Sequence, residues 1–225
     1  MNYEKIDTTQ RGPGVSEEDW NDEFEGCDCT GECSAENNCS CLMSGADNYS
    51  EDARILPSGG QMLVECSDNC SCTLLPRSST DKGQGAKAAE TIRAGEFVCE
   101  YAGECIGEKE VERRCEEFKG HDNYTLTLKE HFGERTIKTF LDPRLRGNIG
   151  RFLNHSCDPN CEVVVVRLGR MVPTAGIFAK RDIETGEELC YDYGNSAIDG
   201  EDRKPCHCKA DNCRKYLPMS ATPIE

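Results

Sequence analysis

Apolar and polar residues alternate along the middle of the chain in the pattern of short strands. Residues 124–128 and 135–141 alternate at every second position, which predicts strands. Residues 161–166 form a β-branched run, Cys-Glu-Val-Val-Val-Val, which also favours a strand. Shorter apolar segments beside turn residues predict further strands at 95–103, 176–179 and 188–191.

One segment has helical spacing instead. Val111, Cys115 and Phe118 fall on one face, and charged residues occupy the other, which predicts a helix over 108–118. Many short strands and a single clear helix indicate a compact, mostly β domain over residues 80–194.

The strand pattern is absent at both ends of the chain. Residues 1–21 are polar and aperiodic, which predicts a flexible N-terminal arm. Residues 22–76 are rich in cysteine and poor in apolar residues, so metal is expected to hold them together. Residues 195–205 indicate a polar linker, and 218–225 a frayed tail.

Composition narrows the class of protein. The chain has 225 residues, 36% hydrophobic and 30% charged, as in a soluble globular protein. No apolar run reaches membrane-spanning length and the N-terminus lacks a signal-peptide core, so an intracellular protein is expected. A net charge of −16 disfavours nucleic acid and favours a cationic partner such as a lysine-rich tail, although a merely soluble surface remains the alternative.

Seventeen cysteines in a chain expected to be intracellular favour metal binding over disulfides. Cys-x-Cys pairs suit a cluster in which thiolates bridge neighbouring zinc ions. The first group of candidate ligands comprises Cys27, Cys29, Cys33, Cys39, Cys41, Cys66, Cys70 and Cys72. The second is Cys206-x-Cys208-x4-Cys213, whose three thiolates leave one tetrahedral position open.

The most distinctive stretch is residues 147–162, Gly-Asn-Ile-Gly-Arg-Phe-Leu-Asn-His-Ser-Cys-Asp-Pro-Asn-Cys-Glu. It mixes hydrogen-bonding, packing and metal-binding side chains. Residues 188–194, Glu-Leu-Cys-Tyr-Asp-Tyr-Gly, follow it. With the cysteine block before and the three cysteines after, these segments resemble the SET-domain histone-lysine methyltransferases of the suppressor-of-variegation class. The resemblance covers residues 22–218.

The resemblance implies a SET fold of several small sheets with a knot-like C-terminal threading. A pre-SET zinc cluster at 22–76 and a post-SET zinc module at 202–218 would flank it. In this family nine cysteines hold up to three zinc ions in the pre-SET module. Eight are present, so that module is expected to be truncated at its C-terminal end, before Lys82. Cys157 would complete the single post-SET zinc site.

The resemblance also assigns roles to individual residues. The catalytic residues would be Tyr193, Tyr124 and Tyr191, and packing in strands is the alternative for these tyrosines. The residues that bind S-adenosyl-L-methionine would be Lys82, Gly83, Gln84, Tyr124, Arg151, Asn154 and His155. A tyrosine at 191, where the family has phenylalanine or tyrosine, predicts a monomethyl or dimethyl product.

The expected substrate is a histone tail peptide or nucleosome, with histone three as the first guess, in the nucleus on chromatin. Neither membrane association nor sequence-specific nucleic-acid binding is expected. Another possibility is a catalytically impaired, zinc-scaffolded module that binds chromatin tails. A zinc-finger DNA binder is disfavoured by the acidic charge and the lack of Cys2His2 spacing.

Overall fold

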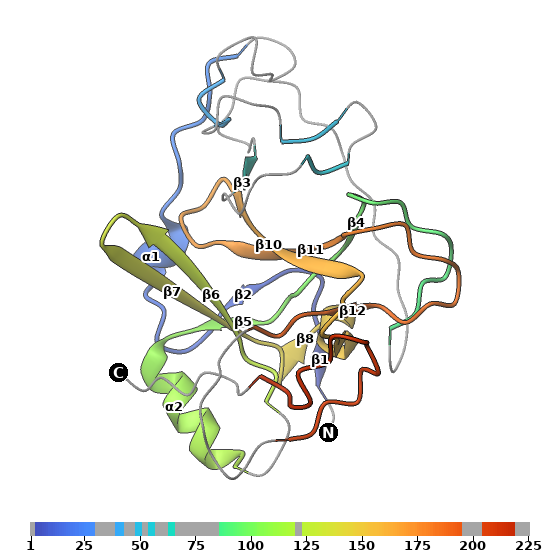
Figure 1. Ribbon diagram of the computed structural model, residues 1–225. Helices are drawn as coiled ribbons and strands as arrows, with labels where there is room; N and C mark the ends of the chain where they lie inside the picture. The colour runs from blue at the N-terminus through green and yellow to red at the C-terminus, as the bar shows by residue number, and fades with distance from the viewer. Residues whose placement is uncertain are drawn as a thin grey trace.

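In the part of the chain that the structure describes, short strands in four small sheets make up most of the regular structure (Figure 1). The chain is described here from a computed structural model, which covers residues 3–29, 39–42, 48–50, 54–56, 63–65, 86–119, 123–194 and 204–218. The strands are β1 (Glu4–Lys5), β2 (Gln10–Arg11), β3 (Leu63–Glu65), β4 (Phe97–Glu100), β5 (Glu104–Ile106), β6 (Leu126–Phe132), β7 (Arg135–Asp142), β8 (Arg146–Gly147), β9 (Asn154–His155), β10 (Cys161–Leu168), β11 (Thr174–Ala179) and β12 (Cys190–Tyr191). The helices are α1 (Glu17–Asn21), α2 (Glu108–Glu117) and a 3-10 turn at Ile149–Phe152.

Two four-stranded sheets form the body of the molecule. One has the order β3-β10-β11-β4 and the other β2-β5-β7-β6. The β-branched run predicted at 161–166 is β10, which pairs antiparallel with β11 so that Val163 faces Ile177. The alternating segment 135–141 falls in β7, and the segment 124–128 enters β6 only at Leu126. The turn of this β6–β7 hairpin places Gly133 at a φ of 61°, a conformation that glycine adopts without strain. The mostly β prediction is therefore confirmed.

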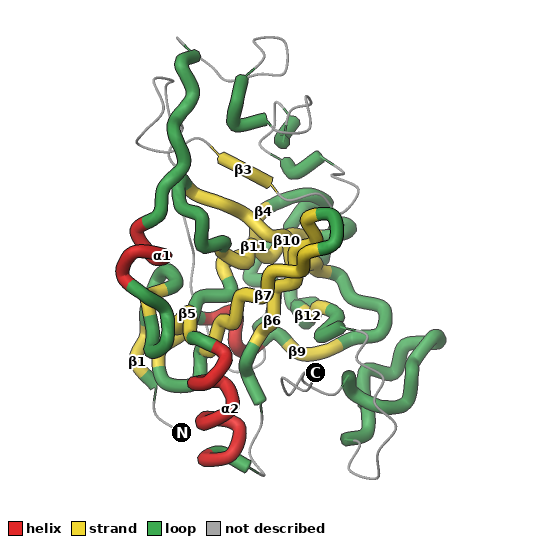
Figure 2. Tube along the Cα trace, turned by 90° about the vertical axis from the view of Figure 1, so that its left-hand side faces the viewer, coloured by secondary structure: helices red, strands yellow, loops and turns green. Residues whose placement is uncertain are grey.

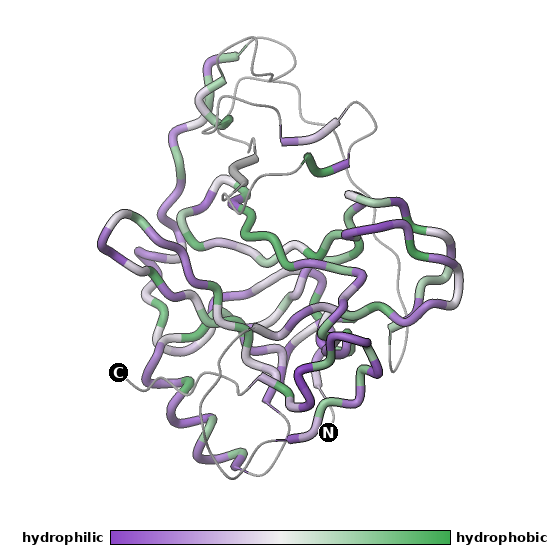
Figure 3. The backbone as a smooth tube through the Cα atoms, viewed as in Figure 1, coloured by the Kyte–Doolittle hydropathy of each residue, from purple (hydrophilic) through white to green (hydrophobic). Residues whose placement is uncertain are grey.

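The hydrophobic core lies where these sheets meet the loops that follow them. Leu141, Leu153, Ile177 and Ile183 are almost completely buried and belong to one cluster. Figure 3 shows hydrophobic residues concentrated along β10 and β11, whereas α2 is largely hydrophilic. The predicted helix is present, with Val111 buried against Ile106 and Phe140. No helix in the described ranges is long and apolar enough to cross a membrane.

The N-terminal segment corrects one expectation. Residues 1–21 were predicted to be a flexible arm, yet β1 pairs parallel with β8 and β2 pairs parallel with β5. Ile6 is 5% exposed, and Thr9 donates hydrogen bonds from its amide and hydroxyl to the Glu100 carboxylate, at 2.9 and 2.5 Å. Low hydrophobicity misled the prediction because the arm is held mainly by main-chain pairing, which leaves no side-chain pattern.

Part of the cysteine-rich block lies on the outer edge of the first sheet. β3 adds to that sheet as a parallel neighbour of β10. Tyr49 and Ile55 pack against Val166 and Phe178, which occupy β10 and β11. The two views of the backbone place this block at one end of the molecule, above β10 (Figures 1 and 2). Contact with the sheet therefore helps to hold the block in place, in addition to any metal that it binds.

Candidate active site and metal centres

The pairing of β9 with β12 brings the two most distinctive sequence segments together. The strands run parallel, with Asn154 opposite Cys190 and His155 opposite Tyr191. The Ser156 amide adds a hydrogen bond of 3.1 Å to the Tyr191 carbonyl. The residues from 153 to 157 therefore lie beside the residues from 190 to 194.

The side chain of Asn160 holds residues 187–190 in place through three hydrogen bonds. Its amide nitrogen donates to the Glu188 carbonyl at 2.8 Å and to the Glu187 carboxylate at 2.9 Å, and its oxygen accepts from the Cys190 amide at 2.9 Å. The residue is 1% exposed, so these bonds satisfy a fully buried amide. The sequence had indicated only a turn former here, because a buried asparagine cannot be distinguished from a turn asparagine by its neighbours.

His155 connects the aromatic residues to the C-terminal cysteines. Its side chain is 1% exposed, and burial lowers the imidazole pKa from its ordinary value. The Tyr193 amide donates to Nδ1 at 3.2 Å, so the ring proton of the neutral form resides on Nε2. Nε2 lies 3.4 Å from Sγ of Cys157 and can donate to that sulfur.

Three tyrosines form an aromatic cluster next to His155. The ring centroids of Tyr191 and Tyr193 are 4.8 Å apart, and those of Tyr101 and Tyr191 are 6.1 Å apart. Tyr191 is 5% exposed and Tyr193 is 40% exposed, so the cluster runs from the core to solvent. Burial raises the phenol pKa of Tyr191 well above its usual range, which keeps that hydroxyl protonated.

Tyr101 is a candidate site residue that sequence reasoning missed. It was assigned to strand structure within Glu100-Tyr-Ala-Gly-Glu104, yet its ring packs edge-on against Tyr191 and its hydroxyl donates to the Tyr124 carbonyl at 2.6 Å. The signal was weak because an aromatic residue at a strand end is ordinarily a packing residue.

The hydroxyl of Tyr193 has a fixed orientation. It donates to the Leu153 carbonyl at 2.8 Å, and the Tyr193 ring lies 5.3 Å from the His155 ring. That bond uses the donor position of the hydroxyl, and a phenol oxygen also has two acceptor positions. A half-exposed, oriented phenol oxygen is suited to contact an amine or a methyl group that enters the cluster.

Arg151 and Tyr124 form a second part of the site. The Arg151 guanidinium carbon lies over the Tyr124 ring, 4.5 Å from its centroid. Arg151 is 7% exposed, and its Nε has no hydrogen-bond partner among the described residues. A buried donor without a partner is costly, which indicates a place for an acceptor such as a carboxylate. The donor set therefore fits the carboxylate end of S-adenosylmethionine.

Asn154, another predicted cofactor residue, is not buried as Arg151 and His155 are. It is exposed, and its amide donates to Oε1 of Glu188 at 2.6 Å. The predicted cofactor residues Lys82, Gly83 and Gln84 lie outside the described residues.

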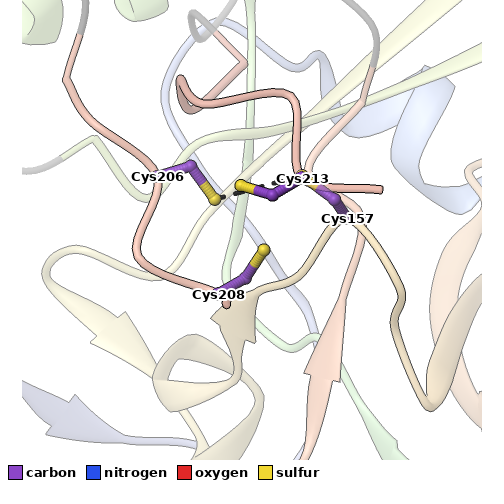
Figure 4. Close-up of side chains that lie close together, drawn as sticks. All are labelled: Cys157, Cys206, Cys208 and Cys213. Atoms are coloured by element: carbon purple, nitrogen blue, oxygen red, sulfur yellow. Dashed lines mark hydrogen bonds between the residues drawn. The ribbon is translucent and has the colours of Figure 1, made fainter. Parts of the chain in front are cut away.

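Four thiols from two segments that are far apart in sequence converge at the C-terminal module. Cys157, Cys206, Cys208 and Cys213 have all sulfur atoms within 4.8 Å of one another, and their side chains point together in Figure 4. Four thiolates around a tetrahedral zinc at about 2.3 Å lie about 3.8 Å apart. The distance from Cys157 Sγ to Cys206 Sγ is 4.0 Å, so the residues fit a zinc ion.

Main-chain donors support the charged form of these thiols. The Arg214 amide donates to Cys157 Sγ at 3.3 Å, and the Lys215 amide donates to Cys213 Sγ at 3.4 Å. Lys215 adopts a φ of 71°, an uncommon conformation for a residue with a side chain. This strained backbone conformation directs the Lys215 amide toward the Cys213 sulfur.

A second thiol group lies in the N-terminal half. The sulfur atoms of Cys27, Cys39 and Cys41 are within 4.8 Å of one another, and all three residues are buried. Cys29 is described and half-buried. The remaining predicted ligands, Cys33, Cys66, Cys70 and Cys72, lie outside the described residues. The three converging thiols fit part of a zinc cluster.

Comparison with known proteins identifies two family models in the chain. The SET domain matches residues 83–194 and the Pre-SET motif matches residues 2–75. The chain is 64% identical to a protein of Caenorhabditis elegans described as "Probable histone-lysine N-methyltransferase set-23", and the alignment covers all of both chains. That alignment spans 245 positions against 225 residues here, so at least 20 positions have no residue in this chain.

Two solved structures have the same fold. The methyltransferase domain of human histone-lysine N-methyltransferase SETMAR aligns with a TM-score of 0.82 and 34% identity, covering 97% of this chain and 90% of that one. KRYPTONITE in complex with DNA, an H3(1-15) peptide and SAH aligns with a TM-score of 0.72 and 27% identity, covering 96% of this chain and 47% of that one.

Proposed function

This chain belongs to the SET-domain histone-lysine methyltransferases that carry a pre-SET motif, and on that premise we propose that it methylates a lysine in the tail of histone three. It is an S-adenosylmethionine-dependent enzyme, and the histone, the product and the residues that act are the parts proposed here. One observation carries the assignment of the site: the β9–β12 pair brings the Tyr191–Tyr193 cluster beside His155, whose other ring nitrogen contacts Cys157.

The reaction needs a neutral amine aligned with the methyl group. When bound, S-adenosylmethionine would supply an electrophilic methyl group on sulfur, which the lysine nitrogen would displace with the electron pair of the carbon–sulfur bond left on sulfur. Free lysine has a pKa of about 10.4, and an apolar channel favours its neutral form. The rings of Tyr101, Tyr191 and Tyr193 would form that channel, and the Tyr193 oxygen would align the amine.

The cofactor would lie on the other side of this cluster. We assign its carboxylate to the unpartnered Nε of Arg151 and its remaining contacts to Tyr124, Asn154 and His155. Lys82, Gly83 and Gln84 would complete the contact. We infer that the positions missing relative to the nematode relative lie just before these residues, where the pre-SET block would be cut short.

Tyr191 would limit the product to one or two methyl groups. It is buried against Tyr101, and its hydroxyl stays protonated at neutral pH. A phenol at this position can retain a water molecule where a third methyl group would otherwise fit. A phenylalanine would release that space.

The proposed substrate follows from the net charge of the chain and from its similarity to a related structure. The chain carries a net charge of −16, which attracts a lysine-rich tail. The related KRYPTONITE structure contains an H3(1-15) peptide. A histone or nucleosome substrate places the enzyme on chromatin in the nucleus. The zinc sites, up to three in the pre-SET block and one after the SET domain, would hold the flanking modules in place.

A peptide array with mass spectrometry tests this function. The wild-type chain is expected to add one or two methyl groups to a lysine of the histone-three tail. Tyr193→Phe should lower kcat by about a hundredfold or more, because amine alignment is lost. Tyr49→Phe serves as the control, because Tyr49 packs against β10 and β11 and not in the aromatic cluster.

The possible outcomes separate the parts of the proposal. A mainly trimethyl product would contradict the role of Tyr191, and methylation of another histone alone would contradict the substrate. Absence of both methyl transfer and S-adenosylhomocysteine binding would favour the alternative, a zinc-scaffolded module that binds chromatin tails.

A further inference from the structure

The ring of Tyr3, in the N-terminal segment, lies directly on the predicted cofactor site. The Arg151 guanidinium carbon is 4.2 Å from the centroid of the Tyr3 ring and lies over its face. The same ring makes an edge contact with Phe152, with centroids 5.8 Å apart. Tyr3 is thus in contact with both residues at the end of the 3-10 turn.

The backbone on each side of Tyr3 is anchored to the catalytic domain. The Glu4 amide donates to the Leu145 carbonyl at 2.8 Å, and the Ile6 amide donates to the Gly147 carbonyl at 2.9 Å. The Glu4 carboxylate pairs with Arg146 at 2.9 Å. These bonds fix the position of Tyr3 relative to residues 145–147, and the ring contact does not depend on a freely moving chain end.

Arg151 has few polar contacts to fix its orientation. Its Nη1 donates to the Arg144 carbonyl at a long 3.4 Å, and its Nε has no partner within the described ranges. No described carboxylate forms an ion pair with it. The guanidinium carbon instead lies over two tyrosine rings, 4.2 Å from the centroid of Tyr3 and 4.5 Å from that of Tyr124. Such cation–π contacts are strongest when water is excluded, and Arg151 is 7% exposed.

We propose that Tyr3 is a positioning residue for the cofactor site, where its ring holds the Arg151 guanidinium so that Nε is free to meet an acceptor of S-adenosylmethionine. The proposal rests on the proposed function, since it takes Arg151 to be a cofactor contact. It extends the cofactor site to the N-terminal segment, which precedes the cysteine block.

The ring rather than the hydroxyl of Tyr3 would perform this role. Tyr3→Ala removes the ring face and opens Arg151 to water, so the guanidinium can rotate away from its productive orientation. The loss of a desolvated cation–π contact corresponds to an affinity for S-adenosylhomocysteine that is about three- to tenfold weaker. Tyr3→Phe keeps the ring face and should bind within about twofold of wild type.

Titration calorimetry with S-adenosylhomocysteine tests the proposal on the purified, zinc-loaded chain. Tyr3→Ala, Tyr3→Phe and Glu4→Gln are compared with wild type. Glu4→Gln removes the neighbouring, exposed ion pair with Arg146 and leaves the ring, so its dissociation constant should match wild type. In steady-state assays Tyr3→Ala should raise KM for S-adenosylmethionine and leave KM for the histone peptide unchanged.

Each result decides a specific point. Weaker binding by Tyr3→Ala alone, rescued by Tyr3→Phe, supports the positioning role. Equal binding by all variants, or equal weakening by Glu4→Gln, overturns it while the enzyme assignment stands. Failure of the wild-type chain to bind S-adenosylhomocysteine overturns both this inference and the proposed function.

Discussion

Two adjacent arginines on α2 occupy opposite environments. The Arg114 side chain is 4% exposed and forms ion pairs with Glu104 at 2.9 Å, Glu110 at 2.8 Å and Asp142 at 3.0 Å. Arg113 is 57% exposed and pairs with Glu110 and Glu117 along the helix. Arg114 therefore neutralises carboxylates at the junction of α2, β5 and β7, whereas Arg113 extends into solvent.

Replacing each arginine with alanine should give very different results. Arg114→Ala leaves the fully buried Asp142 carboxylate without its ion pair, which should lower the free energy of unfolding by about 3–5 kcal/mol. Arg113→Ala removes only exposed pairs and should cost less than about 1 kcal/mol. Urea unfolding measures both. Similar midpoints for the two variants would contradict the role given to Arg114.

Glu187 gives a prediction for acidic pH. Hydrogen bonds from Arg181 and Asn160 lower the pKa of its carboxyl to about 2, below the ordinary value near 4.5. Because the folded state binds this proton less readily, the group stabilises the fold fully above about pH 4.5. That contribution is lost as the pH falls from about 4.5 toward 2.

Thermal unfolding of wild type and Glu187→Gln as a function of pH provides the measurement. The wild-type melting temperature should fall more steeply than that of Glu187→Gln below about pH 4.5. Loss of zinc in acid affects both proteins and cancels in the comparison. Parallel curves would show that Glu187 is not held as described.

At the scale of elements, the spacing of apolar residues predicted the strands and the helix whose side chains follow a regular pattern. The β6–β7 hairpin, β10, β11 and α2 were found at or near their predicted positions. β1, β2 and β9 are two-residue strands whose side chains show no alternation. They exist because a partner strand accepts their main-chain bonds, and a partner distant in sequence leaves no local signal.

The docking of the N-terminal arm can be tested at Thr9. Thr9→Val removes the hydrogen bond from the Thr9 hydroxyl to the half-buried Glu100 carboxylate. Although the amide of a valine can still donate, the loss of the hydroxyl should cost about 1–3 kcal/mol. Thr8→Val, at the exposed neighbouring position, should change stability by no more than about 0.5 kcal/mol. Equal effects in urea unfolding would argue against a docked arm.

At the scale of the whole molecule, the active site depends on segments that are far apart in sequence. Cys157 contacts His155, beside the aromatic cluster, and is also grouped with Cys206, Cys208 and Cys213. His155 contacts both the Tyr193 amide and Cys157. A metal ion at these thiols would therefore attach the C-terminal segment to the site.

Removing one of these thiols should disturb both metal content and activity. Cys208→Ser should lower the zinc content by one ion per chain and reduce kcat/KM by more than about tenfold, because the segment next to Tyr193 loses its anchor. Cys115→Ser, on α2 and outside the thiol groups, is the matched control. A colorimetric chelator assay gives the zinc content. Full activity in a zinc-depleted Cys208→Ser variant would rule out this coupling.

The sequence alone determined the family, the mostly β class, the helix and the two cysteine-rich regions. These depend on residue types at fixed spacings, which follow from local geometry and metal chemistry. It correctly grouped Cys157 with the last three cysteines, through the resemblance.

The tertiary structure decided what depends on contacts between distant segments. It placed Tyr101 in the aromatic cluster, joined Asn160 to β12 by a hydrogen bond, and stacked Tyr3 against Arg151. It also separated the buried Arg114 from the exposed Arg113, which are indistinguishable in sequence. Burial and partner choice are set by the packing of the whole chain, so an isolated residue or motif carries no record of them.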